Sequence, residues 1–182
     1  MRMPKAWVVA AALLTALLAG CDEHGGEAVV PPPREVGDSA IGHYCGMALA
    51  EHPGPKGQIF LAGKPDPVWC SSVHDAFAFT LLPEEPKDIA AIYVNDMGKA
   101  KNWDPPEAGS WIDAKKAWYV IGSSRKGGMG GDEAVPFGDE AAARDFAAAN
   151  GGRLVRFDTM PKSYIIPEGG QGPAAPAGKV SP

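Results

Sequence analysis

The chain has 182 residues and a formal net charge of −5 at pH 7, with 45% hydrophobic and 21% charged residues. This length suffices for one domain with a sizeable core or for two small lobes. The acidic balance argues against a nucleic-acid partner, because nucleic acids select proteins with basic surfaces.

The first 20 residues are typical of a secretory signal peptide. Arg2 and Lys5 supply the positive start, and residues 6–19 are apolar apart from one threonine, a run too short for a membrane-spanning helix. The run ends in Leu-Ala-Gly followed by Cys21, which resembles the lipobox of bacterial lipoproteins. That resemblance implies cleavage before Cys21 and attachment of diacylglycerol to its sulfur. The alternative is ordinary cleavage, which would leave Cys21 as a free thiol.

Lipidation at Cys21 would hold the protein at the periplasmic side of a membrane. Asp22 resembles the inner-membrane retention signal of enterobacterial lipoproteins and favours the inner membrane, with the outer membrane left open. Residues 21–41 are rich in Gly, Pro and charge, so we predict a flexible tether. Residues 163–182 are mainly Pro, Gly and Ala at their end, and we predict a disordered tail.

The stretch His43-Tyr-Cys-Gly-Met places three potential soft-metal ligands in five residues: His43, Cys45 and Met47. A thiolate combined with a thioether favours Cu(I). In an extended backbone, Cys45 and Met47 would point to the same side and could converge on one ion. The main alternative is a disulfide between Cys45 and Cys70, the default for two thiols in an oxidising compartment.

The next part of the chain predicts strand, strand, helix and strand. We expect strands at 57–62 and 67–70, a helix at 72–82 and a strand at 89–94. Ser72 begins the helix as a cap. The predicted buried stripe of this helix comprises Val73, Phe77 and Leu81, with Ala76 and Thr80 beside them.

The second half repeats this order. We expect strands at 117–121, 134–137 and 153–157, with a helix that begins after Asp139 and ends at residues 150–152. The sequence therefore predicts an α+β fold of two ββαβ lobes, an internal pseudo-repeat. Their expected bounds are residues 42–104 and 105–162.

An overlay of the two halves pairs Val68 with Val135, Cys70 with Phe137 and Phe79 with Phe146 at constant spacing. A cysteine in a phenylalanine position most simply behaves as a small buried hydrophobe. We therefore favour a core role for Cys70, with a disulfide to Cys45 and metal ligation as the alternatives. His74 is expected on the exposed face of the first helix.

A second candidate ligand lies between glycine pairs, in the stretch Lys126-Gly-Gly-Met-Gly-Gly. A loop of this kind cannot bury Met129 by helix or strand packing. A thioether on such a loop suits capture and release of Cu(I). The alternatives are a core plug, a phosphate-binding loop and a partner-binding methionine. The phosphate alternative is the weakest, because no Gly-Lys-Ser/Thr sequence ends the loop.

Together these motifs resemble one family. The matching stretches are the lipobox, His-Tyr-Cys-Gly-Met, residues 52–58, residues 92–97, Ala-Trp-Tyr-Val at 117–120, and Gly-Gly-Met-Gly followed by residues 133–137. They are similar to the NosL family, the copper-binding accessory lipoproteins of nitrous oxide reductase. The resemblance extends from about residue 43 to residue 161.

The resemblance implies a periplasmic Cu(I) chaperone that supplies copper for the multicopper centre of nitrous oxide reductase and docks on an ABC-transporter-type maturation complex. It implies two ββαβ lobes and a relation to organomercurial lyases. The motif matches point to Cys45, Met47 and Met129 as copper ligands. His43 is a further candidate, because imidazole also binds copper.

Two other classes of function compete with this one. An organomercurial-lyase-like enzyme would need two thiols and a carboxylate, for which Cys45, Cys70 and Asp75 or Asp132 could be proposed. A membrane-tethered assembly adaptor would need no metal transfer. Burial of Cys70 would remove the dithiol site, and we predict that the protein is not an enzyme.

Overall fold

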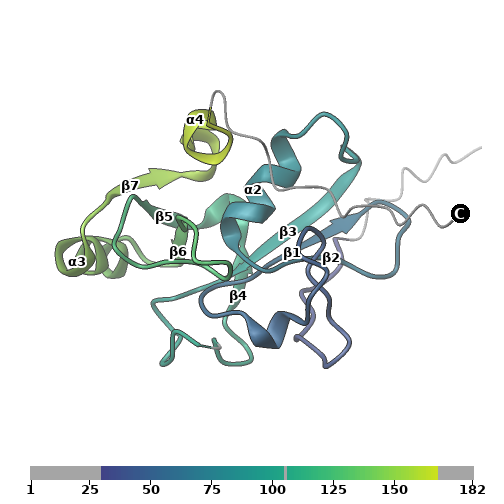
Figure 1. Cartoon of the computed structure of the whole chain (residues 1–182), viewed down its shortest axis with the longest axis horizontal. Coiled ribbons are helices and arrows are strands. Elements are labelled where there is room, and N and C mark those ends of the chain that lie inside the picture. The colour runs from purple at the N-terminus through teal and green to yellow at the C-terminus, as the bar shows by residue number, and fades with distance from the viewer. Residues whose placement is uncertain (1–29, 105, 168–182) are drawn as a thin grey trace, which may run out of the picture.

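The computed structural model describes residues 30–104 and 106–167, which form two small antiparallel sheets with a few helices (Figure 1). In chain order, the elements of the first part are η1 (Leu49–Glu51), β1 (Gly57–Leu61), β2 (Val68–Cys70), α2 (Val73–Leu81), β3 (Ile89–Asn95) and β4 (Trp111–Asp113). Those of the second part are η2 (Ala114–Lys116), β5 (Trp118–Ile121), β6 (Val135–Phe137), α3 (Glu140–Asn150), β7 (Arg153–Arg156), η3 (Phe157–Thr159) and α4 (Lys162–Ile165). The predicted α+β fold class is confirmed.

In both sheets the first strand of the lobe lies between its second and third strands, and the first sheet has β4 as an additional edge strand. The first sheet runs β2-β1-β3-β4 and the second runs β6-β5-β7, with antiparallel pairs throughout. Cys70 pairs with Gly57, the first residue of β1, as Phe137 pairs with Trp118, the first residue of β5. The equivalence of Cys70 and Phe137 that the overlay predicted is therefore present in the strand register.

One strand departs from the predicted repeat. β4 follows residue 105, where we expected the second lobe to begin, yet it pairs with β3 and extends the first sheet. It has only three residues and lacks a clear alternation of polar and apolar positions. With so few residues and no clear periodicity, the local sequence gives little sign of this strand.

The helix termini follow the predicted capping chemistry. The side chain of Ser72 accepts a hydrogen bond from the backbone N–H of Asp75 at 3.0 Å. The side chain of Asp139 does the same for Ala142 at 3.0 Å. Gly151 follows α3 with a φ of 76°, a left-handed conformation that glycine adopts without strain. These caps fix where α2 and α3 begin and where α3 ends.

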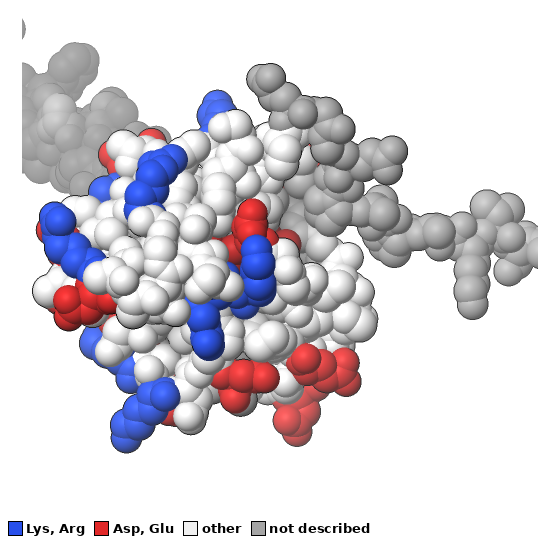
Figure 2. Space-filling view, turned by 60° about the vertical axis from the view of Figure 1, so that its left-hand side comes forward, with Lys and Arg blue, Asp and Glu red and all other residues white. Residues whose placement is uncertain are grey.

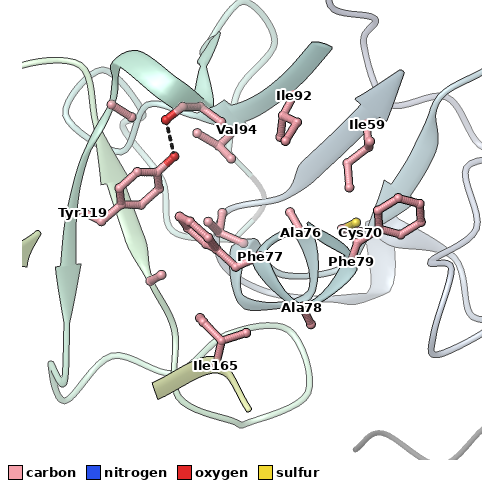
Figure 3. Packing of buried hydrophobic residues seen from close by; sticks show 14 of the residues in the cluster. Ile59, Cys70, Ala76, Phe77, Ala78, Phe79, Ile92, Val94, Tyr119 and Ile165 are labelled. Atoms are coloured by element: carbon pink, nitrogen blue, oxygen red, sulfur yellow. Dashed lines mark hydrogen bonds between the residues drawn. The ribbon is translucent and has the colours of Figure 1, made fainter. Parts of the chain in front are cut away.

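The main core lies around α2 (Figure 3). The buried face of this helix differs from the predicted stripe, because Thr80 and Leu81 are only half-buried. Ala78 and Phe79 are buried together with Val73, Ala76 and Phe77. The ring of Phe77 packs edge-on against Tyr119 of β5, with 5.0 Å between centroids. The Tyr119 hydroxyl donates to the carbonyl of Ala114 at 2.6 Å. Helix α2 therefore joins the two lobes, which explains why more than one of its faces is apolar.

Both ends of the described chain are more structured than the sequence suggested. From Pro31 onward the expected tether lies along the first sheet: Tyr93 donates to the carbonyl of Pro31 at 2.8 Å, and Arg34 exchanges two hydrogen bonds with the Gln58 side chain. At the other end, α4 occupies the first part of the expected tail, and Ile165 is buried in the main core. Backbone hydrogen bonds at one end and the buried side chain of Ile165 at the other supply contacts that composition alone does not reveal.

Charges of both signs are interspersed with uncharged surface on the face drawn in Figure 2. This mixture of signs accompanies a formal net charge of −5. In the part of the chain that the structure describes, no helix is long and apolar enough to cross a membrane. The predicted signal peptide and Cys21 lie outside the described residues.

Candidate functional site

Cys45 lies in a tight turn and not in the extended segment that we expected. An antiparallel bridge joins Ile41 to Ala48, the N–H of Gly42 donates to the carbonyl of Met47 at 2.9 Å, and the N–H of Gly46 donates to the carbonyl of Gly42 at 2.8 Å. Cys45 is half-buried and Met47 is 40% exposed. The sulfur of Cys45 lies 4.0 Å from the carbonyl oxygen of Met47, so both residues border the same turn.

The turn is attached to the first sheet. Gly42 forms a parallel bridge with Trp69, and the N–H of His43 donates to the Trp69 carbonyl at 2.8 Å. A Cβ atom at position 42 would lie 2.5 Å from the sulfur of Cys45. Glycine at this position therefore makes the room that the thiol occupies.

His52 was not predicted to have a role in the site, although residues 52–58 are among the stretches that carry the family resemblance. Its side chain is buried, and its Nε2 atom lies 3.4 Å from the sulfur of Cys45. Its Nδ1 atom lies 3.0 Å from the carbonyl oxygen of Gly128. A carbonyl oxygen only accepts, so Nδ1 carries the proton and, in the neutral ring, the lone pair of Nε2 faces Cys45. His52 thus connects the thiol to the glycine-rich loop of the second lobe.

The glycine-rich loop folds back on itself and closes against the first lobe. Lys126 and Asp132 form an isolated antiparallel β-bridge at the base of the loop. Within the loop, the N–H of Gly127 donates to the carbonyl of Gly131 at 3.0 Å. A Cβ atom on Gly128 would lie 2.6 Å from the carbonyl oxygen of Ser71. Met129, next to that contact, is 62% exposed. The loop therefore presents a thioether to solvent directly beside the residue that holds His52.

His43 points to a different partner. Its Nε2 atom lies 2.9 Å from a carboxylate oxygen of Glu85, which also accepts a hydrogen bond from the Tyr44 hydroxyl at 2.9 Å. Its ring packs edge-on against Phe79 at 5.5 Å between centroids. In this arrangement the imidazole beside Cys45 belongs to His52, whereas His43 ties the turn to the chain that follows α2.

Cys70 is a core residue. It is fully buried, and Figure 3 shows its sulfur beside α2 near Ala76 and Phe79. Burial raises the pKa of the Cys70 thiol well above its usual value, which makes the thiol a poor nucleophile and metal ligand. Cys45 and Cys70 are both free thiols.

His74 is half-buried and not exposed as we expected. Its ring packs against Tyr164, and its Nε2 atom lies 3.3 Å from the Tyr164 carbonyl oxygen. The cause is α4, which was not predicted and which contacts α2. His74 also borders a cavity of about 110 Å³ between the start of α2 and the loop of Met129.

Two buried ionisable side chains, Lys56 and Glu133, lie next to the segments that form the site. Burial lowers the pKa of Lys56 to about 8 and raises the pKa of Glu133 to about 8. Glu133 accepts hydrogen bonds from the N–H groups of His74 and Ala134 at 2.9 Å each. A Cβ atom on Gly127 would lie 2.4 Å from the other carboxyl oxygen of Glu133, so this side chain supports the base of the loop.

The arrangement can bind a soft cation. Cys45 and His52 supply a sulfur and a nitrogen donor at contact distance, and the exposed thioethers of Met47 and Met129 lie on the two segments that meet there. This donor set suits Cu(I). Across residues 30–104 and 106–167, no group of three or more His, Cys, Asp or Glu side chains is arranged to hold a metal ion.

Comparison with known proteins gives a consistent result. The NosL family model matches residues 33–165. The copper-binding lipoprotein NosL of Achromobacter cycloclastes is 47% identical over 160 residues, 87% of this chain and 81% of that protein. Its namesake from Stutzerimonas stutzeri is 36% identical over 155 residues, 85% and 80% of the two chains. The crystal structure of the copper chaperone NosL from Shewanella denitrificans is 33% identical, with a TM-score of 0.68 over 73% of this chain and 99% of that one.

Proposed function

The chain belongs to the NosL family, and from this premise we propose that it is a lipid-anchored copper chaperone that binds Cu(I) at Cys45. The observation that carries the proposal is the 3.4 Å contact between the sulfur of Cys45 and Nε2 of His52, beside the loop of Met129. Cys45 is the anionic ligand, His52 the nitrogen donor, and Met129 and Met47 compete as the thioether ligand. His43 is an alternative nitrogen donor if it leaves Glu85.

The proposed activity is transfer of copper and not chemical turnover. Binding replaces the proton of the Cys45 thiol by Cu(I), so one proton is released for each ion bound. Exposed thioethers can leave the ion one at a time while donor atoms of an acceptor protein take their places. The few ligands and the exposure of Met129 keep this exchange accessible.

The proposed location is the periplasmic side of a membrane, with the lipid on Cys21. The relatives are named lipoproteins, and Asp22 favours the inner membrane. The proposed partners are nitrous oxide reductase and its ABC-transporter-type maturation complex, which would receive the copper. Both partners are inferred from the family resemblance of the sequence.

Burial of Cys70 weighs against the lyase alternative. That chemistry needs a second thiol beside the first, and the thiol of Cys70 lies in the core with a raised pKa. We therefore propose a binding protein and not an enzyme. An assembly adaptor without metal transfer would be distinguished by partner binding that persists after loss of Cys45.

A competitive Cu(I) titration under reducing, anaerobic conditions tests the proposal. The sample is the mature chain with Cys21 replaced by serine, alone and with Cys45→Ala, Met129→Ala, Met47→Ala, His52→Ala or His43→Ala. We expect one tightly bound Cu(I) per chain, lost in Cys45→Ala and weakened at least tenfold in His52→Ala and Met129→Ala. Absence of binding in the unsubstituted chain, or binding that does not depend on Cys45, would overturn the proposal.

A further inference from the structure

The side chain of Lys56 is buried, and the backbone of residues 52–54 surrounds its ammonium group. Lys56 is 3% exposed. Its Nζ atom donates to the carbonyl oxygens of His52 at 2.7 Å, Pro53 at 3.1 Å and Gly54 at 2.6 Å. All three donor positions of the ammonium are therefore used by one short stretch of backbone.

This arrangement is unusual for a lysine. Lysine is among the residues least often fully buried, and a buried cation is normally paired with an anion. Among the described residues, no carboxylate lies within ion-pair distance of Lys56. An apolar side chain would avoid the cost of desolvating the ammonium, so the three carbonyl contacts call for a specific reason.

The contacts of Lys56 fix the backbone of His52. The N–H of His52 donates to the carbonyl of Leu49 at 3.1 Å, and its carbonyl accepts from Lys56. Lys56 is itself fixed to the first sheet, because its N–H donates to the side chain of Asn95 at 2.7 Å. His52 is thus held on both sides of its backbone, and Lys56 supplies one of the two attachments.

The imidazole of His52 depends on that backbone. To donate from Nδ1 to Gly128 while Nε2 faces Cys45, the ring needs a fixed position and one tautomer. We propose that Lys56 is a positioning residue, whose hydrogen bonds to the 52–54 backbone hold the His52 ring in the tautomer and orientation that present Nε2 to Cys45 before copper binds. This proposal rests on the proposed function only for its consequence, which is tighter copper binding through preorganisation.

Lys87 provides a matched control. Its Nζ atom also donates to three backbone carbonyls, those of Phe79, Thr80 and Leu82 at the end of α2. Those carbonyls belong to none of the residues that contact Cys45. Lys87→Met therefore removes the same kind of interaction without disturbing the His52 loop.

The test compares Lys56→Met, Lys56→Arg and Lys87→Met with the unsubstituted mature chain carrying Cys21→Ser. The first readout uses copper-free protein: long-range ¹H–¹⁵N correlation spectra, in which protonated and unprotonated ring nitrogens have distinct shifts. We expect His52 to be protonated at Nδ1 alone in the unsubstituted chain and in Lys87→Met. In Lys56→Met we expect averaging between the two tautomers, with the fixed tautomer restored at least in part by Lys56→Arg.

The second readout is Cu(I) affinity, measured by competition at a temperature where circular dichroism shows each variant folded. We expect a loss of tenfold or more in Lys56→Met and no change in Lys87→Met. If Lys56→Met does not fold, Lys56→Gln takes its place, because it keeps two N–H donors but loses the charge and the third donor.

The two readouts separate this inference from the proposed function. If the unsubstituted chain binds no Cu(I), the proposed function fails, while the tautomer of His52 still decides the role of Lys56. If the His52 signals and the copper affinity are the same with and without the Lys56 ammonium, the positioning role is overturned. It is also overturned if Lys87→Met changes both readouts as much as Lys56→Met does.

Discussion

The Nε2 atom of His52 lies 3.4 Å from the sulfur of Cys45, and the other ring nitrogen lies 3.0 Å from the carbonyl oxygen of Gly128. One imidazole therefore links a turn of the first lobe to the loop of the second lobe that carries Met129. The proposed copper ligands of the two lobes are therefore connected in the copper-free protein, so we expect the geometry of the loop to influence copper binding.

Gly128→Ala tests that influence. The added methyl group would lie 2.6 Å from the Ser71 carbonyl oxygen and 3.0 Å from Cβ of His52, so the loop must move away from His52. We expect a loss of stability of about 1–3 kcal/mol from overpacking and a Cu(I) affinity at least tenfold weaker. Denaturant unfolding and competitive copper titration measure the two effects.

Gly131→Ala is the control within the same loop. A Cβ atom at position 131 meets nothing within 4 Å, and the φ of this residue is not positive. This variant should therefore bind copper like the unsubstituted chain. Equal affinities in Gly128→Ala and Gly131→Ala would show that contact between the loop and His52 is irrelevant to binding.

Cys70→Ala should lower stability and leave copper binding intact. Removing a fully buried sulfur from the packed core should cost about 1–2 kcal/mol, by analogy with other small truncations in cores. Cys70→Ser should cost more, because it buries a hydroxyl in the same apolar position. Thermal unfolding and Cu(I) titration give the two values. A copper affinity that falls in both variants would make Cys70 a candidate ligand again.

Copper binding should release one proton per ion. Cu(I) added as an acetonitrile complex to weakly buffered protein would displace the thiol proton of Cys45, and a pH indicator would record the release. Met129→Ala, measured at saturating copper, should release the same amount because a thioether carries no proton. Binding without proton release would contradict coordination by Cys45 as a displaced thiol.

Glu133→Gln should change how stability depends on pH. The pKa of Glu133 is raised to about 8 in the folded protein by burial, whereas the pKa of a glutamate in an unfolded chain is about 4.3. Between these values only the folded state holds the proton, so this group's contribution to stability is fully present below about 4.3 and is lost as pH rises towards 8. Glutamine does not titrate, so the stability of Glu133→Gln lacks this contribution to the decrease with rising pH.

The measurement is urea unfolding of both proteins at pH 5.5, 6.5 and 7.5. The free energy of unfolding of the unsubstituted chain, relative to Glu133→Gln, should fall by up to about 1.4 kcal/mol per pH unit, the slope for one proton. Titrating groups that do not interact with Glu133 cancel in the difference, and the comparison ends at pH 7.5 because Lys56, with a pKa of about 8, interacts with the Glu133 charge. Parallel curves would mean that Glu133 is ionised in the folded protein at neutral pH.

Local signals were sufficient to predict most of the fold. The caps at Ser72 and Asp139 and the periodicity of the flanking segments placed α2 and α3 within about one residue of their observed bounds. The predicted match of Phe79 with Phe146 also places both at the seventh residue of their helices. β4 was missed because three residues without clear alternation carry little strand signal, and α4 was missed because it packs against α2, far away in the chain.

The candidate site was only partly accessible from sequence. Cys45 and Met129 stand out because they are soft donors in glycine-containing motifs. His52 lies in residues 52–58, which contribute to the family resemblance, but nothing in this stretch shows which residues lie beside the imidazole. Its partner Gly128 is 76 residues away. The turn of Cys45 was likewise hidden, because it is held by the bridge from Gly42 to Trp69 of the first sheet.

The two lobes differ most in the connection between their first two strands. Six residues separate Leu61 from Val68 in the first lobe, and thirteen separate Ile121 from Val135 in the second. The additional residues are those that bring Met129 and Gly128 to the first lobe. If both lobes had connections of the same length, each lobe would make the same contacts with the other. Such a protein would have either two equivalent sites or none. The longer connection makes the two lobes unequal, so the proposed site is a single one: the first lobe supplies Cys45 and His52, and the loop of the second lobe reaches them.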